Sequence, residues 1–413
     1  MIPADNRNKL QEFFLIFIIG LLNTIGPFSI DMYLPAFPEI AGELHTNIQT
    51  ISLSVSTYFL GFAAGQILYG PLLDRFGRKK PLYIGLAAYI ITTVACGLSG
   101  SVAVFLSMRF LQALSGSVGA VAALAMVRDF YPPGKSASII SFLILIISLS
   151  PMLAPSAGSF VAAAFGWRSI FITLASIAFI VMLLVFIFLP QSRPPDVSIS
   201  LRPKPIIINF KNILSRPQFY VYTLAGTFSF AALFVYVAGS PGIFMDGFKV
   251  SAKIYGGIFA LLSVGFIGAS QLNHALTRRY KSQKIFRAVI VVQIMTAALF
   301  FIGVINNWYG LAATLVFLFI ILGCAGLSYP NAAAVALAPF ADNAGSASAL
   351  LGFIQMGIGG LLSSAVGLIK IKGSLPASLL ILITSVIAAV ILLATAGRVR
   401  NTVEAEADAN VFH

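Results

Sequence analysis

The sequence contains few charged residues, cysteines and histidines. Asp, Glu, Lys and Arg make up 9% of its 413 residues, against about 25% in a typical soluble protein. Hydrophobic residues make up 59%, and the mean hydropathy is +0.96. Two cysteines and three histidines are too few for a disulfide framework or a metal cluster. These deficits exclude an ordinary soluble enzyme, a disordered chain and a disulfide scaffold, and they leave a polytopic helical membrane protein.

Acidic residues are the scarcest charged group. The chain has 13 Asp and Glu against 26 Lys and Arg, which gives a formal net charge of +13. In a soluble protein this excess would suggest nucleic-acid binding, but no basic runs alternate with aromatic residues, so we expect no nucleic-acid partner. In a membrane protein the location of the basic residues reports topology, because Lys and Arg collect in cytoplasmic loops.

Long hydrophobic runs are abundant. A spanning helix needs about 20 mostly apolar residues. Twelve such segments are predicted, at 12–34, 49–72, 81–99, 103–127, 136–163, 167–189, 218–239, 253–277, 285–305, 308–338, 345–369 and 375–396. The segment 308–338 exceeds one straight span, and its Gly323, Gly326 and Pro330 predict that it bends or ends outside the lipid.

Placing both termini in the cytoplasm sorts the basic residues. Twenty of the 26 then fall on the inner side and five on the outer side, while Arg109 lies inside a span. This asymmetry predicts cytoplasmic termini. The first segment follows Arg7 and Lys9, as a signal peptide would, but its apolar run is too long and lacks a clean cleavage pattern. We therefore expect a retained first helix.

A polar, proline-containing stretch divides the spans into two groups of six. Residues 190–217 are predicted to form a cytoplasmic linker, between an N-terminal six-helix bundle at 1–189 and a C-terminal six-helix bundle at 218–397. Residues 398–413 form a cytoplasmic tail. The predicted fold is therefore an all-α polytopic membrane protein with two pseudo-symmetric bundles.

Short motifs repeat between the two groups. Four residues of the first group recur 204 positions later: Gly61, Phe62, Arg75 and Lys80 correspond to Gly265, Phe266, Arg279 and Lys284. Parallel repeats of this kind let two halves of a transporter rock about a central substrate site.

The loop between the second and third spans, residues 70–80, has the sequence GPLLDRFGRKK. Gly70 and Pro71 are expected to end the second helix, and Gly77 permits a tight turn. Asp74 can accept hydrogen bonds from an arginine or cap the positive end of a helix. The alternative is an ordinary basic inner loop.

Arg109 and Gln112 place polar groups inside the fourth span. A charged residue at mid-membrane costs about 2.5–3.5 kcal/mol on insertion scales, so it usually faces the protein interior and has a partner. Gln112 lies one turn further along the same helix face, which favours an inward polar patch. The alternative is that Arg109 reaches water at the outer surface.

Asp31 is the predicted partner of Arg109. Both lie near the outer ends of their spans, and therefore at comparable depth. Pro27 and Pro35 flank Asp31 and predict a locally broken helix, which is tolerated where it lines a cavity. The alternative is an acid at the membrane edge that faces external water.

Other polar residues inside spans are candidates for a substrate cavity, although each can equally form a hydrogen bond between helices. They are Tyr33, Tyr58, Gln66, Tyr236, Asn331 and Gln355.

The motifs together resemble the major facilitator superfamily, and within it the Bcr/CflA group of drug/proton antiporters. The resemblance rests on residues 31–38 (DMYLPAFP), on the 70–80 loop, on 109–112 (RFLQ), on 127–129 (VRD) and on 166–171 (GWRSIF). All of these motifs lie in the first half of the chain. The second half resembles the group in the arrangement of its spans more than in its individual residues.

The resemblance implies roles for several residues. In the superfamily the 70–80 loop latches the two halves in the outward-facing state, so Gly70, Asp74, Arg75, Gly77 and Arg78 are expected to act in gating. Similar Arg-x-x-Gln patterns serve proton coupling, and this assigns that role to Arg109 and Gln112, together with their predicted partner Asp31.

The fifth span resembles an element typical of drug/proton antiporters, Gly-Pro-x-x-Gly-Gly. Here Pro151, Pro155 and Gly158 are expected to form the antiporter helix kink, while Ala154 and Ser159 replace two of the glycines. The alternative is a kink in an ordinary packed helix.

The resemblance implies a proton-coupled efflux antiporter in a bacterial inner membrane, exporting small amphipathic drugs such as chloramphenicol- or bicyclomycin-like compounds. We expect Asp31 to bind an external proton and to stay neutral while buried, because burial disfavours a carboxylate. Arg109 favours the ionised form, so the pair can act as a switch at a site for which drug and proton compete.

The expected partners are a small-molecule substrate, protons and the lipid bilayer. We expect a monomer, since one chain carries all twelve helices, and no cofactor, since the proton gradient supplies the energy. One alternative keeps the fold: export or import of an endogenous metabolite such as a siderophore, dipeptide, sugar or organic acid. A membrane enzyme or a receptor is disfavoured, because no nucleophile–base set, metal spacing or phosphate loop occurs in the sequence.

Overall fold

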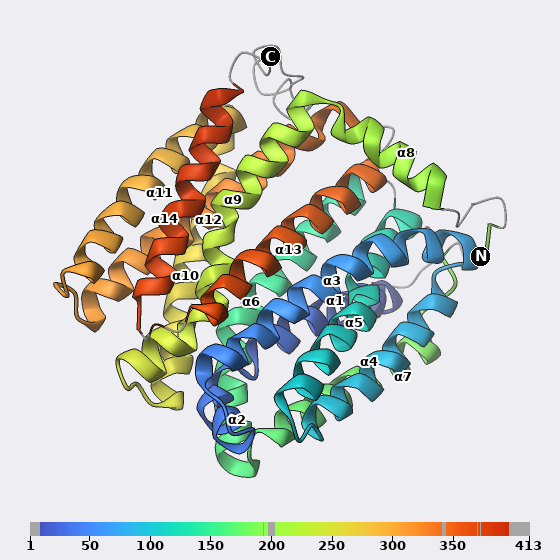
Figure 1. Ribbon diagram of the computed structural model, residues 1–413. Coiled ribbons are helices and arrows are strands. Elements are labelled where there is room, and N and C mark those ends of the chain that lie inside the picture. Colours follow the sequence, from blue (N-terminus) through green and yellow to red (C-terminus); the bar gives the residue numbers. More distant parts are fainter. Residues whose placement is uncertain are drawn as a thin grey trace. The chain divides into compact units, whose positions relative to one another are not determined.

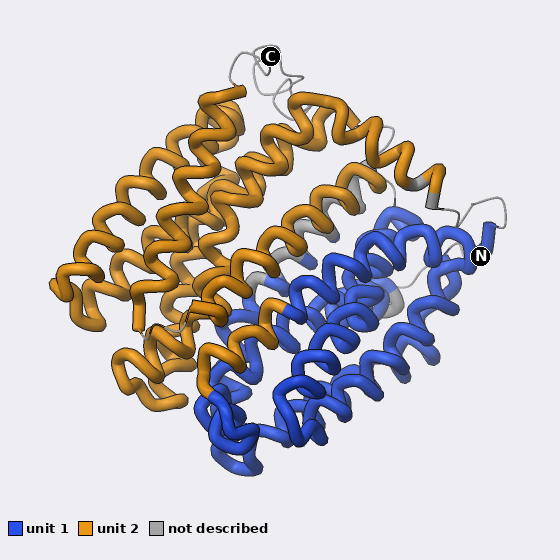
Figure 2. Tube along the Cα trace, in the orientation of Figure 1, with its two compact units in different colours: residues 1–46, 57–201 blue, residues 47–56, 202–413 orange. Residues whose placement is uncertain are grey.

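The computed structural model describes residues 9–131, 133–192, 194–196, 203–340, 344–369, 371 and 373–395. Within these ranges the backbone forms helices joined by turns and contains no strand. The chain divides into two compact units (Figure 2): unit 1 comprises residues 1–46 and 57–201, and unit 2 comprises residues 47–56 and 202–413. The boundary after residue 201 falls inside the predicted linker, and the predicted tail at 398–413 lies outside the described residues.

The helices are labelled in Figure 1. The first group is α1 (Lys9–Asp31), the 3₁₀ helix η2 (Leu34–Ala36), α2 (Phe37–Glu43), α3 (Ile48–Phe76), α4 (Lys79–Gly97), α5 (Val102–Phe130), α6 (Pro133–Phe165) and α7 (Arg168–Phe188). The second group is α8 (Pro203–Leu214), α9 (Pro217–Pro241), the π-helix η3 (Gly242–Gly247), α10 (Ala252–Thr277), α11 (Ser282–Ile305), α12 (Leu311–Leu337), the 3₁₀ helix η4 (Ala338–Phe340), α13 (Ala344–Leu368) and α14 (Leu375–Ala394).

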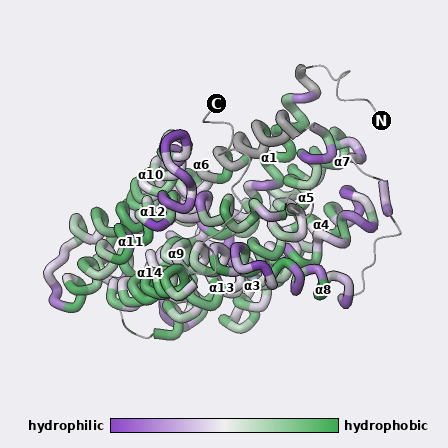
Figure 3. The backbone as a smooth tube through the Cα atoms, turned by 90° about the horizontal axis from the view of Figure 1, so that it is seen from above, coloured by the Kyte–Doolittle hydropathy of each residue, from purple (hydrophilic) through white to green (hydrophobic). Residues whose placement is uncertain are grey.

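The predicted spans each contain one long helix. Among the described residues, eleven helices are long and apolar enough to cross a membrane, and the searched part of α6 contributes a shorter apolar stretch, Leu149–Phe165. Because α6 as a whole has 33 residues, it also exceeds the length of a span. Figure 3 shows hydrophobic residues along the helices and hydrophilic residues gathered mainly in the turns.

Most predicted helix ends differ from the structure by a few residues, and two of the differences bear on specific predictions. Gly70 and Pro71 do not end the second span: α3 continues through both to Phe76. Pro71 costs the helix one backbone hydrogen bond, but Leu73 in the following turn is buried in the core of unit 1. The tenth span begins at Leu311 rather than at residue 308, so the helix is shorter than the hydrophobic run.

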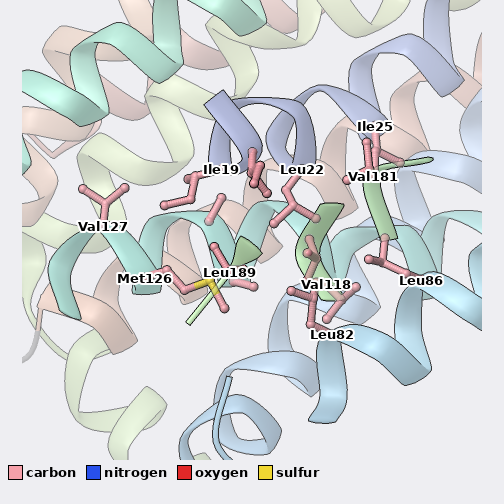
Figure 4. Packing of buried hydrophobic residues seen from close by; sticks show 14 of the residues in the cluster. Ile19, Leu22, Ile25, Leu82, Leu86, Val118, Met126, Val127, Val181 and Leu189 are labelled. Atoms are coloured by element: carbon pink, nitrogen blue, oxygen red, sulfur yellow. The ribbon is translucent and has the colours of Figure 1, made fainter. Parts of the chain in front are cut away.

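The core of unit 1 lies where α1, α4, α5 and α7 meet. It includes Leu22 of α1, Leu86 of α4, Val118 of α5 and Val181 of α7 (Figure 4), all nearly or fully buried. Gly119 brings α5 close to α1, because a Cβ at this position would lie 2.6 Å from the carbonyl oxygen of Leu22. Small residues therefore allow backbone contact between the helices.

The helix pairing of unit 1 recurs in unit 2. In unit 1, α4 packs against α5 and α7, and α1 packs against α5 and α6. In unit 2, α11 packs against α12 and α14, and α9 packs against α12 and α13. The repeated glycines occupy equivalent contacts: a Cβ at Gly61 would collide with the carbonyl oxygen of Phe110, and one at Gly265 would lie 3.0 Å from that of Phe319.

The beginning of α3 groups with unit 2, although the rest of this helix belongs to unit 1. Within unit 2, the Ser363 hydroxyl donates to the hydroxyl oxygen of Ser56 at 3.0 Å. Gly367 allows α13 to approach this segment closely, because a Cβ there would lie 2.7 Å from the carbonyl oxygen of Gln49.

Candidate functional site

Arg109 is the centre of the polar site in unit 1. Its side chain extends from α5 and is fully buried. The guanidinium carbon lies 4.3 Å from the ring centroid of Tyr33 and 4.4 Å from that of Tyr58. Such contacts stabilise a cation through the negative faces of the rings. In this structure Arg109 therefore does not reach water at the outer surface.

Two acceptors bind the guanidinium. Arg109 donates from Nη2 to the carbonyl oxygen of Ser29 at 2.9 Å, and from Nη1 to Oε1 of Gln112. Gln112 is itself fully buried and donates from Nε2 to Oγ1 of Thr93 at 2.8 Å. The predicted inward polar patch of Arg109 and Gln112 is therefore present, and it connects α1, α4 and α5.

The Ser29 carbonyl belongs to the last turn of α1. Carbonyl groups at a helix C-terminus have no intrahelical donor, and a cation there also interacts favourably with the helix dipole. The Ser29 hydroxyl makes a second link, a hydrogen bond of 2.5 Å with the hydroxyl of Tyr89 on α4. Arg109 and Tyr89 thus fix the end of α1 from two neighbouring helices.

Asp31 is the last residue of α1 and is buried, with 5% of its surface exposed. The helix breaks there, as predicted: a turn leads into η2 and then α2. The expected ion pair with Arg109 does not form among the described residues. The guanidinium instead binds Ser29, two residues before Asp31. The predicted contact between Asp31 and Arg109 is therefore wrong for this structure.

The antiporter-like segment of α6 packs against this break. A Cβ at Gly158 would collide with the carbonyl oxygen of Met32, the residue that follows Asp31. Glycine therefore allows the α6 backbone to touch the turn. Pro151 and Pro155 lie inside one continuous helix, and the kink expected at them stays a prediction.

Residues at the start of α7 bind the segment after the break. Trp167 is buried and donates from Nε1 to Oε2 of Glu43 at 2.8 Å. Arg168 forms an ion pair with the same carboxylate, and Gly166 makes the preceding turn with φ +79°. The motif at 166–171 was recognised in the sequence, but its contact with α2 was missed because the partners lie more than a hundred residues apart.

The 70–80 loop forms a charged cluster at one end of unit 1. Arg78 donates from Nε to Oδ2 of Asp129 at 2.8 Å and from Nη1 to Oδ1 of Asp74 at 2.5 Å. Ser192 donates to the same Asp129 oxygen at 2.8 Å. Burial alone lowers the pKa of the Arg78 guanidinium, but the interactions with Asp129 and Asp74 outweigh it and raise that pKa.

The backbone of this loop matches the prediction at Gly77, which has φ +77°. The carbonyl oxygen of Arg75 accepts a hydrogen bond of 3.1 Å from the backbone nitrogen of Asp196. The loop therefore connects α3 and α4 to α5 and to the residues that follow α7. Gly70 lies within α3 with open space beside it.

The remaining candidate cavity residues fall into two sets. Tyr33 and Tyr58 belong to the Arg109 site, and Gln66 is half-buried on α3. Tyr236, Asn331 and Gln355 are buried in unit 2.

The described contacts do not bring the unit 2 residues together. Tyr236 packs against the ring of Phe259, and Asn331 donates to Oδ1 of Asn273 at 2.6 Å. These contacts fit bonds between helices as well as they fit a cavity wall.

Residues 13–364 match the family model described as Major Facilitator Superfamily. The chain belongs to the major facilitator superfamily. The superfamily fold agrees with a solved structure, a D-xylose-proton symporter, with a TM-score of 0.73 and 14% identity over 91% of this chain and 97% of that one. At this identity the likeness concerns the fold alone.

Relatives within the superfamily are closer in sequence. An uncharacterized MFS-type transporter, YdgK of Bacillus subtilis, is 31% identical over 92% of this chain and 95% of its own length. A bicyclomycin resistance protein homolog of Haemophilus influenzae is 27% identical over 90% and 93%. The multidrug resistance protein MdtL of Escherichia coli is 30% identical over 83% and 85%. The predicted resemblance to the Bcr/CflA group is confirmed by this set.

The superfamily repeat has a polar counterpart in unit 2 that was not predicted. Gln293 on α11 is fully buried, accepts from the Ser229 hydroxyl at 2.6 Å and donates to the Ser229 carbonyl at 2.9 Å. Ser229 lies 200 residues after Ser29, and Gln293 lies 204 after Tyr89. Because the two offsets differ, a search at the fixed 204-residue spacing would have found Gln293 but not Ser229.

Proposed function

We propose that the protein is a proton-coupled efflux antiporter. It exports small amphipathic drugs, such as chloramphenicol- or bicyclomycin-like compounds, from the cytoplasm across a bacterial inner membrane. It works as a monomer, with both termini in the cytoplasm and no cofactor. The names of two relatives, a bicyclomycin resistance protein homolog and a multidrug resistance protein, support drug export. The predominance of basic residues in the predicted inner loops supports the orientation.

The observation that carries proton coupling is the position of Asp31. It is a buried acid at the broken end of α1, without an ion-pair partner among the described residues. A carboxylate buried without a cation is costly, and a negative charge at a helix C-terminus is also disfavoured. Asp31 therefore carries a proton while it is buried and releases it only when its surroundings change.

Arg109 acts in this scheme as a positioning residue. By binding the carbonyl of Ser29, it holds the last turn of α1 and sets where Asp31 lies. Gly158 supports the same turn from α6. The cycle then has three steps: Asp31 binds a proton from the outer side, becomes buried in the neutral form, and loses the proton to the cytoplasm as drug enters the site.

The available energy is sufficient for such exchange. One charge that crosses 100 mV is worth about 2.3 kcal/mol, and a tenfold concentration ratio costs about 1.4 kcal/mol. A single net charge can therefore sustain roughly a 50-fold outward drug gradient, and a pH difference adds to it.

Drug susceptibility of a hypersensitive bacterial host tests the proposed function. Expression of the chain should raise the inhibitory concentration of chloramphenicol- or bicyclomycin-like compounds. Expressing cells should also accumulate less of the compound than cells without the chain, and an uncoupler should abolish this difference. Unchanged susceptibility to every compound, together with uptake of a labelled siderophore, dipeptide, sugar or organic acid, would favour the metabolite alternative instead.

A further inference from the structure

Helix α8 is shorter than the spanning helices of unit 2. It has twelve residues, too few to span a membrane, and it lies in the predicted linker. Figure 1 shows α8 leaving the end of α9 at a steep angle instead of running alongside it. Within unit 2 it packs against α9 and α13.

One face of α8 belongs to the protein core. Ile213 is buried in the cluster that contains residues of α9 and α13, and Phe210 is half-buried against the same cluster. These two residues are three apart and therefore share a helix face. The packing orients α8 about its own axis.

The exposed side of α8 that borders the core face carries apolar and basic side chains together, since Ile207 and Leu214 lie three and four residues from Phe210. Ile207 is 61% exposed, Ile208 49% and Leu214 41%. Lys204 and Lys211 are exposed and seven residues apart, as are Ile207 and Leu214, so each pair forms a line along the same side. No acidic residue lies between 203 and 216. An apolar line bordered by lysines matches a helix that lies in a membrane interface.

We propose that this face of α8 binds the membrane surface through anionic phospholipid. Ile207 and Leu214 enter the boundary between headgroups and acyl chains, while Lys204 and Lys211 extend their ammonium groups to lipid phosphates. The methylene groups of a lysine can lie along apolar surface while its ammonium group stays among the lipid headgroups. Charge complementarity selects an anionic headgroup such as phosphatidylglycerol over a zwitterionic one. This inference is independent of the transported substrate.

Spin labels on the full-length protein in lipid nanodiscs test the proposal. The label is placed at Ile207→Cys on the proposed lipid face and at Asn212→Cys, which is exposed on another side of α8. Cys96 and Cys324 are buried, and the unsubstituted protein gives the background. Oxygen, which concentrates in lipid, should relax the label at 207 more than a water-soluble nickel chelate does, and the label at 212 should show the reverse.

The anionic requirement is tested by charge removal. Lys204→Ser with Lys211→Ser should lower the ratio of lipid-inserted to water-exposed label at 207 about 30-fold in phosphatidylglycerol nanodiscs, because each basic residue near an anionic surface contributes about 1 kcal/mol. Lys249→Ser with Lys253→Ser removes the same charge from the opposite end of α9 and should leave the ratio unchanged. Both control lysines are exposed.

Three results would overturn the proposal. Equal access of the nickel chelate to labels at 207 and 212 would place α8 in water. Protection of the label at 207 from both reagents would mean that protein covers this face. Insertion that is the same in phosphatidylcholine and phosphatidylglycerol, and unchanged by removal of Lys204 and Lys211, would refute anionic lipid binding.

Discussion

At the scale of single residues, the polar site is organised by one buried guanidinium. The sequence predicted that Arg109 turns inward and that Gln112 lies beside it, because insertion of a charge into lipid is costly and the spacing is one helical turn. It could not predict Ser29 as the partner in α1, since a backbone carbonyl carries no residue-type signal. The structure supplies that partner because α1 ends two residues later.

Replacement of Arg109 by lysine should impair both stability and transport. Lysine keeps the charge but cannot bind Ser29 and Gln112 with the same planar fork, so at least one buried acceptor loses its donor at a cost of about 1–3 kcal/mol. Thermal unfolding in detergent and drug uptake by inverted vesicles measure the two effects. Arg128→Lys is the matched control, because Arg128 is exposed on the same helix.

Normal transport by the Arg109→Lys variant at saturating substrate would contradict this role. A variant that unfolds at the wild-type temperature but does not transport would instead assign Arg109 directly to proton transfer.

At the scale of helices, the break in α1 and its contact with α6 position the site. The sequence predicted the break from Pro27 and Pro35, and the helix indeed ends at Asp31. It did not reveal that Gly158 touches the turn, because a glycine in a hydrophobic segment looks the same whether its neighbour is lipid or backbone. Pro71 was misjudged for a related reason: local propensity does not report the packing that keeps α3 helical to Phe76.

Gly158→Ala should separate α6 from the broken end of α1. The added methyl group would collide with the carbonyl oxygen of Met32, and overpacking of this kind typically costs about 1–3 kcal/mol. We expect lower thermal stability and loss of drug transport in vesicles. Gly257→Ala on α10, where nothing lies near the added group, should behave as wild type; equal behaviour of the two variants would refute the close contact.

The ion pairs of Arg78 with Asp74 and Asp129 should stabilise the folded state of unit 1. Arg78→Gln leaves the largely buried Asp129 without its cation, and loss of one partner of a buried pair costs about 3–5 kcal/mol. Asp129→Asn should be less damaging in the Arg78→Gln background than in the wild type, as a double-mutant cycle of unfolding temperatures would reveal. Additive effects would mean that the two residues act independently.

At the scale of the whole molecule, hydrophobic runs and the 204-residue repeat predicted the architecture well. Both signals arise from the bilayer, which demands long apolar helices, and from duplication of one packing pattern. Helix α8, within the linker, was not predicted, because the lysines and prolines in its sequence are typical of a loop and its apolar residues form too short a run for a span. The pairing of Ser229 with Gln293 escaped as well, since its counterpart in unit 1 uses a tyrosine instead of a glutamine.

The orientation can be tested by labelling cysteines in intact cells. Lys249→Cys lies in a predicted outer loop and should react with a membrane-impermeant maleimide. Arg279→Cys lies in a predicted inner loop and should react only after the cells are permeabilised, because the positive-inside rule places this basic loop in the cytoplasm. The reverse pattern would place both termini outside.

The central claim is that protonation of Asp31 couples drug movement to the proton gradient. Its most direct test is drug accumulation by proteoliposomes under an imposed pH gradient, with wild type, Asp31→Asn and Asp31→Glu compared at equal protein content. We predict that the wild type accumulates drug, that Asp31→Glu retains part of this activity, and that Asp31→Asn still exchanges labelled for unlabelled drug but accumulates none. Gradient-driven accumulation by Asp31→Asn at the wild-type rate would contradict the account.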